Sequence, residues 1–120
     1  MMTRYKGLTL RILSRSRPAI GPGKAELLDR IVATGSISAA AREMGMSYRR
    51  AWMLVEALNE DFSGPLVETA TGGRRGGGAT VTELGLDVLR RYRSMEARAS
   101  ATIGRELGGM ERLLKRPPKR

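Results

Sequence analysis

The chain has 120 residues, enough for one domain with a modest core, and its 41% hydrophobic content excludes wholesale disorder. Lysine and arginine number 22 against 12 acidic residues, and the resulting formal charge of +10 favours a polyanionic partner, usually nucleic acid. Cysteine and histidine are absent, which excludes disulfides and zinc fingers and removes the commonest general base. We therefore expect no enzyme, no cofactor and no metal site.

The sequence shows no sign of membrane insertion. No stretch approaches 18 consecutive apolar residues, so we expect no transmembrane helix. Arg11, Arg15 and Arg17 interrupt the apolar residues near the N-terminus, which argues against a signal peptide. We expect a cytoplasmic protein that does not bind a membrane.

The first third of the chain predicts one strand and one helix. Residues 8–14 alternate apolar and polar side chains, which is typical of a strand. Pro22 suits the first turn of a helix and Gly35 suits its end, so the helix should run from about Pro22 to Thr34. Its apolar stripe is expected to comprise Leu27, Leu28, Ile31 and Val32.

Two more helices follow and match the helix-turn-helix pattern. Ser36 and Ser47 are suitable N-caps, and Gly45 between them is suited to a tight turn. The three alanines at 39–41 carry no bulk, so the second of these helices can cross the first closely. That second helix should reach about Phe62, with an apolar inner face of Ala51, Val55, Leu58 and Phe62.

The N-terminal half of this helix supplies the candidate DNA-binding residues, which are Ser47, Tyr48, Arg49, Arg50 and Met53. In helix-turn-helix proteins this half of the second helix enters the major groove. Arginine can pair with guanine O6 and N7 or bind phosphate. Two arginines alone would more often belong to a solvated face, but the surrounding pattern favours a binding role.

A β-hairpin is predicted next, from strands at 66–71 and 79–81 joined by a glycine-rich segment. A hairpin after a helix-turn-helix is a wing. Arg74 and Arg75 lie in the connecting segment, where they could bind phosphates or an adjacent minor groove. A turn whose arginines touch nothing fits the sequence equally well.

The last predicted helix begins after Thr82 and covers 83–114, which is longer than one small core can bury. Its apolar residues recur at spacings of three and four, so the stripe suggests a second copy of the chain. We therefore predict a homodimer through Val88, Tyr92, Met95, Ile103 and Leu107. Residues 115–120 form a basic, proline-containing tail.

Several segments together resemble a known family. They are the runs at 34–41 (TGSISAAA), 46–52 (MSYRRAW), 66–73 (LVETATGG), 76–79 (GGGA) and 84–85 (LG). They are similar, in the same order, to the N-terminal domain of ModE, the molybdate-responsive transcription regulators whose winged helix is of the LysR type. The resemblance spans about 8–93.

The resemblance implies a winged helix-turn-helix that dimerises through long helices and binds palindromic operators. It implies that Ser47, Tyr48, Arg49 and Arg50 face DNA and that residues 72–78 form the wing. Full-length ModE regulators continue into a pair of oxyanion-binding domains, whereas this sequence stops at Arg120. We expect no molybdate site and no small-molecule effector in this chain.

The expected fold is mainly α with a small β-hairpin, a winged helix-turn-helix with a long C-terminal dimerisation helix. The DNA-binding domain should cover 1–82, the dimerisation helix 83–114 and the tail 115–120. We expect a sequence-specific transcription regulator that binds double-stranded DNA as a dimer. An RNA-binding or architectural protein without sequence specificity, using its glycine–arginine segment, is the main alternative. A protein-interaction module that pairs its long helix with another chain is a further alternative.

Overall fold

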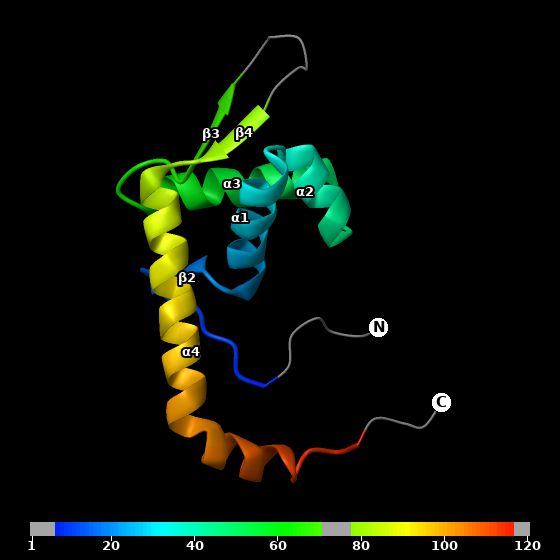
Figure 1. The fold of residues 1–120 in the computed structure, drawn as a ribbon, viewed down its shortest axis with the longest axis vertical. Helices are drawn as coiled ribbons and strands as arrows, with labels where there is room; N and C mark the ends of the chain where they lie inside the picture. The colour runs from blue at the N-terminus through cyan, green and yellow to red at the C-terminus, as the bar shows by residue number, and fades with distance from the viewer. Residues whose placement is uncertain (1–6, 71–77, 117–120) are drawn as a thin grey trace.

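The structure, a computed structural model, describes residues 7–70 and 78–116. Its elements, in chain order, are β1 (Ile12–Ser14), β2 (Arg17–Ile20), α1 (Pro22–Thr34), α2 (Ile37–Met44), α3 (Tyr48–Asp61), β3 (Val67–Ala70), β4 (Gly78–Val81) and α4 (Glu83–Glu111). Figure 1 shows α3 between the β3–β4 hairpin and α1, with α2 beside one end of α3 and α4 beside the other. The predicted winged helix-turn-helix is confirmed.

Local capping signals explain why the helices begin and end near the predicted residues. The Ser36 hydroxyl accepts a hydrogen bond from the Ala39 N–H at 3.0 Å, and Ser47 does the same for the Arg50 N–H at 3.0 Å. Gly45 ends α2 with φ at 69°, a conformation that costs glycine little. These caps satisfy helix-end groups that would otherwise lack partners, so a few residues set each boundary.

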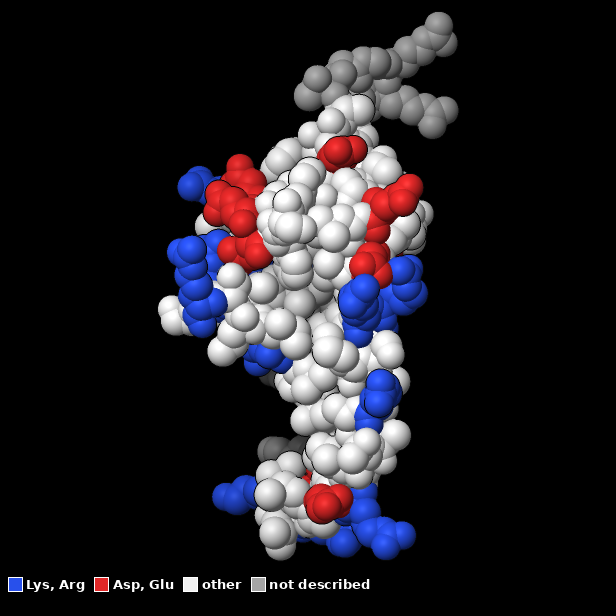
Figure 2. Space-filling view, turned by 90° about the vertical axis from the view of Figure 1, so that its left-hand side faces the viewer, with Lys and Arg blue, Asp and Glu red and all other residues white. Residues whose placement is uncertain are grey.

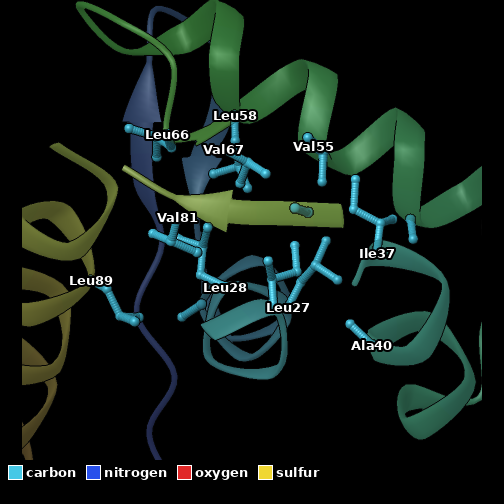
Figure 3. Close-up of a cluster of buried hydrophobic side chains, with 14 of the residues drawn as sticks. Leu27, Leu28, Ile37, Ala40, Val55, Leu58, Leu66, Val67, Val81 and Leu89 are labelled. Carbon is cyan, nitrogen blue, oxygen red and sulfur yellow. The ribbon is translucent and has the colours of Figure 1, made fainter. Parts of the chain in front are cut away.

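The core lies where α1, α2 and α3 meet the two wing strands. Figure 3 shows Leu27 and Leu28 of α1 and Val55 and Leu58 of α3 pointing toward each other, with Val81 of β4 close by. All five side chains are buried. Burying a leucine or valine side chain contributes about 1.5–3 kcal/mol, so this contact fixes how α3 sits on the domain.

The N-terminal region differs from the prediction of a single strand at 8–14. Only Ile12–Ser14 is a strand, and it pairs antiparallel with β2, a second strand that the sequence reading missed. Val32 also differs, because it was placed in the apolar stripe of α1 and is 52% exposed. The buried residues of α1 are Pro22, Ala25, Leu27, Leu28 and Ile31, so Val32 lies outside the buried face.

Helix α4 extends well beyond the core. Leu89 and Tyr92 in its first half are buried, whereas Leu113 and Leu114 beyond its end are 81% and 63% exposed. The orange part of the helix changes direction in Figure 1. The C-terminal third of α4 contains Gly104, Gly108 and Gly109. Glycine is a common cause of such bends. The apolar residues of α4 therefore continue beyond the core, where the described residues leave several of them exposed.

Candidate nucleic-acid interface

The N-terminal half of α3 presents its side chains to solvent. Tyr48 is 54% exposed and Met53 is 59% exposed, and Ser47, Arg49 and Arg50 are also exposed. Ala51, Val55 and Leu58 on the opposite side of the same helix are buried. The core thus holds one face of α3, and the predicted DNA-facing residues lie outside it.

The described arginines differ in whether they form ion pairs. Within the described residues neither Arg49 nor Arg50 forms an ion pair. Five arginines elsewhere pair with acidic side chains of the same chain, namely Arg17, Arg30, Arg90, Arg91 and Arg93. An arginine without an internal partner keeps all its donors available to a phosphate or a base edge. The start of α3 therefore has two cationic groups on an exposed helix face that form no ion pair with any described residue.

Asn59 joins the C-terminal half of α3 to the wing. Its amide oxygen accepts hydrogen bonds from the N–H groups of Leu66, at 2.8 Å, and Val67, at 3.1 Å. Its amide nitrogen donates to the carbonyl of Val67 at 3.0 Å. Sequence reasoning missed this residue. In the sequence, Asn59 is only a polar residue beside the apolar face of a helix. That pattern does not indicate a hydrogen bond to the backbone seven residues later.

Further backbone contacts fix the base of the wing. The Ala79 N–H donates to the carbonyl of Gly35 at 2.9 Å, which ties β4 to the turn between α1 and α2. The Thr82 N–H donates to the carbonyl of Leu66 at 2.9 Å, and the Thr82 hydroxyl caps α4. A Cβ added at Gly85 would lie 2.6 Å from Val81 Cγ1 and closer still to the Leu66 carbonyl oxygen. Only glycine lets α4 pass this junction.

The N-terminal hairpin is tied to the other end of α3. Arg17 pairs with Asp61 and lies 3.7 Å from a carboxylate oxygen of Glu60. The hydrogen bond to Asp61 raises the pKa of the Arg17 guanidinium above its ordinary value. The missed strand β2 therefore has a positioning role, because it holds the C-terminal end of the helix.

Arg74 and Arg75, the predicted wing contacts, lie outside the described residues. The strands beside them are described and pair antiparallel from Val67 with Val81 to Ala70 with Gly78. In Figure 1 this hairpin extends away from the core on the side of α3 opposite α1. The described part of the wing therefore leads away from the hydrophobic core.

The five predicted dimerisation residues occupy different environments. Tyr92 is only 1% exposed, and its hydroxyl donates to the Leu10 carbonyl at 2.8 Å, so it has almost no surface left for a second chain. Burial raises the pKa of this phenol. Val88 also packs against the core of its own protomer. Met95 is 42% exposed, and Ile103 and Leu107 are half-buried.

The side of the molecule seen in Figure 2 carries charges of both signs around an uncharged central strip. A surface of mixed sign lacks the uniform positive potential that attracts a polyanion.

None of the described helices is long and apolar enough to cross a membrane. The described residues also contain no cluster of acidic side chains able to hold a metal ion.

Curated relatives match this chain over most of its length. It is 42% identical over 93 residues to the molybdenum-pterin-binding protein MopA of Rhodobacter capsulatus, a match that covers 78% of this chain and 35% of MopA. It is 41% identical over 71 residues to the DNA-binding transcriptional dual regulator ModE of Escherichia coli, covering 59% of this chain and 27% of ModE. The chain thus spans about a third of these relatives.

Solved structures show the same fold. The full-length regulator LysG of Corynebacterium glutamicum matches with a TM-score of 0.53 at 24% sequence identity, covering 74% of this chain and 29% of LysG. The family model for bacterial regulatory helix-turn-helix proteins of the LysR family matches residues 23–86. That match contains α1 from its second residue, α2, α3 and both wing strands, which are the elements that position the exposed arginines. The chain belongs to the LysR family of bacterial regulatory helix-turn-helix proteins.

Proposed function

We propose that this chain binds double-stranded DNA in a sequence-specific way and regulates transcription. The observation that carries the proposal is the exposed N-terminal half of α3, where Arg49 and Arg50 have no ion pair within the described residues. This half belongs to the second helix of a helix-turn-helix, the element that enters the major groove in this class of fold. As part of the same proposal, the protein acts in the cytoplasm. Its role is to bind DNA, and it does not catalyse a reaction.

The proposed residues divide the work by their chemistry. Tyr48, Arg49, Arg50 and Met53 would contact base edges, since the major groove presents a distinct donor and acceptor pattern for each base pair. Ser47 caps the helix through its hydroxyl and would lie close to the DNA backbone. Arg74 and Arg75 would bind phosphates, which supplies affinity without a fixed register.

We propose that the DNA-bound form is a homodimer. Apolar residues of α4 remain exposed beyond the core, among them Met95 at 42% and Met110 at 60%. Apolar residues left exposed on a helix that extends beyond its own core favour an interaction site. Tyr92 and Val88 pack within their own protomer, and Leu107 lies beside Gly7 of the same chain. Met95 and Ile103 are therefore the predicted residues that can best meet a second chain. The division into a DNA-binding domain at 1–82, a dimerisation segment at 83–114 and a tail at 115–120 belongs to this proposal. Helix α4 itself ends at Glu111, three residues before the predicted end.

Sedimentation at tens of micromolar tests the dimer. The wild-type chain should sediment as a dimer, and a Met95→Glu and Ile103→Glu double variant should sediment as a monomer with the helical content of the wild type. Val32→Glu is the matched control, because Val32 is an exposed apolar residue on α1, and this variant should remain dimeric. A monomeric wild type would contradict the dimer.

Fluorescence anisotropy tests the binding function. A library of duplex DNA and single-stranded RNA of the same length are titrated separately with the protein. The proposal predicts tight binding to a subset of duplexes and weaker, uniform binding to RNA. Preferential binding to single-stranded RNA would favour the alternative of an RNA-binding protein.

A further inference from the structure

Tyr48 and Trp52 lie one helical turn apart on α3 and form an aromatic pair. Their ring centroids are 6.2 Å apart and their planes meet at 80°, an edge-to-face arrangement. At 100° per residue the two positions differ by about 40° around the helix. Side chains on a helix lean toward its N-terminus, so Trp52 leans back toward Tyr48. This pair borders the row of candidate DNA-contacting residues.

The two rings also line a hollow of about 220 Å³ between α3, the start of α2 and the two wing strands. Ser36, Ile37 and Ser38 line it from the start of α2, and Thr69, Ala70, Gly78 and Ala79 line it from the wing strands. Tyr48 therefore lies on the flank of α3 that faces the wing. At 100° per residue Arg50 falls on the opposite flank, about 160° away around the helix.

The core fixes one ring of the pair and leaves the other to solvent. Trp52 is half-buried and packs against the hydrophobic core. Tyr48 is 54% exposed, and its hydroxyl makes no hydrogen bond within the described residues. An exposed tyrosine without a neighbour samples several rotamers and must be ordered before it can make a specific contact. Edge-to-face contact with an anchored indole restricts that freedom in advance.

We propose that Trp52 is a positioning residue that holds Tyr48 ready to contact DNA between α3 and the wing. This inference rests on the proposed DNA-binding function and deepens it. Trp52 acts through Tyr48 and makes no required contact with DNA of its own. The pair explains how an exposed aromatic side chain can contribute to a defined interface.

A double-mutant cycle tests this role, with a labelled duplex that carries the sequence selected by the wild-type protein from a random pool. The variants are Tyr48→Ala, Trp52→Leu, the combination of both, and Trp52→Phe as the conservative control. Trp52→Leu keeps apolar bulk and removes the ring, whereas Trp52→Phe keeps a ring and removes the indole N–H. The cycle isolates the coupling between two side chains. Circular dichroism sets a temperature at which every variant is folded.

Trp52→Leu should weaken binding to the selected duplex by about 3- to 10-fold, the range expected for loss of an aromatic pair. In the Tyr48→Ala background the same change should alter affinity by less than about twofold, because nothing remains to be positioned. Trp52→Phe should bind like the wild type. An equal loss of affinity in the wild-type and Tyr48→Ala backgrounds would overturn the proposal. A Trp52→Phe variant that binds as weakly as Trp52→Leu would also overturn it, since that result would assign a direct DNA contact to the indole N–H.

A second measurement does not alter the core. Trp52 is the single tryptophan of the chain, so its fluorescence reports on this pair alone. Tyr48→Ala should shift the emission of the free protein to longer wavelength because the indole loses its cover. Unchanged emission would show that Tyr48 does not lie over Trp52 in solution. A wild type that selects no duplex would be a failure of the proposed function, and it would be seen before any variant is made.

Discussion

The two halves of α3 have the same helical backbone and very different surroundings. The first half carries exposed arginines without ion pairs within the described residues, whereas the second half is packed through Leu58, bonded to β3 through Asn59 and paired with the N-terminal hairpin through Asp61. We propose that this difference in partners separates the residues of α3 that contact DNA from those that hold the helix in place. We expect substitutions in the second half to change stability and those in the first half to change recognition.

The largest expected effect is on the stability of the second half. Leu58 is 0% exposed, so Leu58→Ala should lower the free energy of unfolding by about 2–5 kcal/mol through lost burial and a cavity. Met53→Ala on the opposite, exposed side of α3 should change it by less than about 0.5 kcal/mol. Urea titrations of both variants measure this. Similar losses for both would mean that α3 is not held by one face.

The next largest effect on stability is expected at Gly85, where α4 passes the base of the wing. Gly85→Ala forces a methyl group against Leu66 and Val81 and should lower the free energy of unfolding by about 1–3 kcal/mol. Gly104→Ala in the same helix meets no atom within 4 Å and should raise it by about 0.5–1 kcal/mol. Thermal unfolding of the two variants compares them directly. If Gly85→Ala were as stable as the wild type, α4 would not pass as close to the wing base as the structure shows.

We expect DNA recognition to depend on the N-terminal half of α3. Arg49→Ala or Arg50→Ala should cost about 1–3 kcal/mol of binding free energy on the preferred duplex and much less on a random duplex. Thermal stability should not fall, because neither side chain has an ion pair to lose within the described residues. Arg98→Ala on α4 is the control, since it removes an exposed arginine at a distance from α3. Fluorescence anisotropy measures the ratio of the affinities for the preferred and the random duplex. Equal losses of affinity on both duplexes would assign these arginines to phosphate binding.

The smallest and least specific effect is expected from the wing arginines. A double substitution of Arg74→Ala and Arg75→Ala should weaken binding to preferred and random duplexes alike. It should also reduce the log–log slope of affinity against salt by about one for each lost phosphate contact. A salt series on both duplexes provides the measurement. Loss of the preference itself would mean that the wing reads bases in the minor groove.

The sequence predicted the features that depend on neighbouring residues. Pro22, Ser36 and Ser47 set the starts of α1, α2 and α3, and Gly35 and Gly45 set the ends of α1 and α2, through bonds or conformations within a few residues. These boundaries could therefore be predicted. The exposed face of α3 followed from helical periodicity alone. Both kinds of signal are local, and neither requires knowledge of how the chain folds back on itself.

The features that were missed depend on distant partners. Tyr92 has the spacing of a dimerisation residue, but its hydroxyl bonds to Leu10, which lies 82 positions earlier. Strand β2 contains Pro18, which weakens any strand prediction, and β2 is held in part by Asp61 at the far end of α3. Asn59 carried no pattern that pointed to β3. Contacts between distant segments cannot be read from periodicity.

Selection of bound sequences from a random duplex pool tests the central claim most directly. The account predicts that the wild-type chain enriches one sequence with two related half-sites, as a symmetric dimer requires. It predicts that a double substitution of Arg49→Ala and Arg50→Ala abolishes the enrichment, while Arg98→Ala preserves it. A wild-type pool that stays random despite binding, or a double variant that enriches the same sequence equally well, would contradict the account.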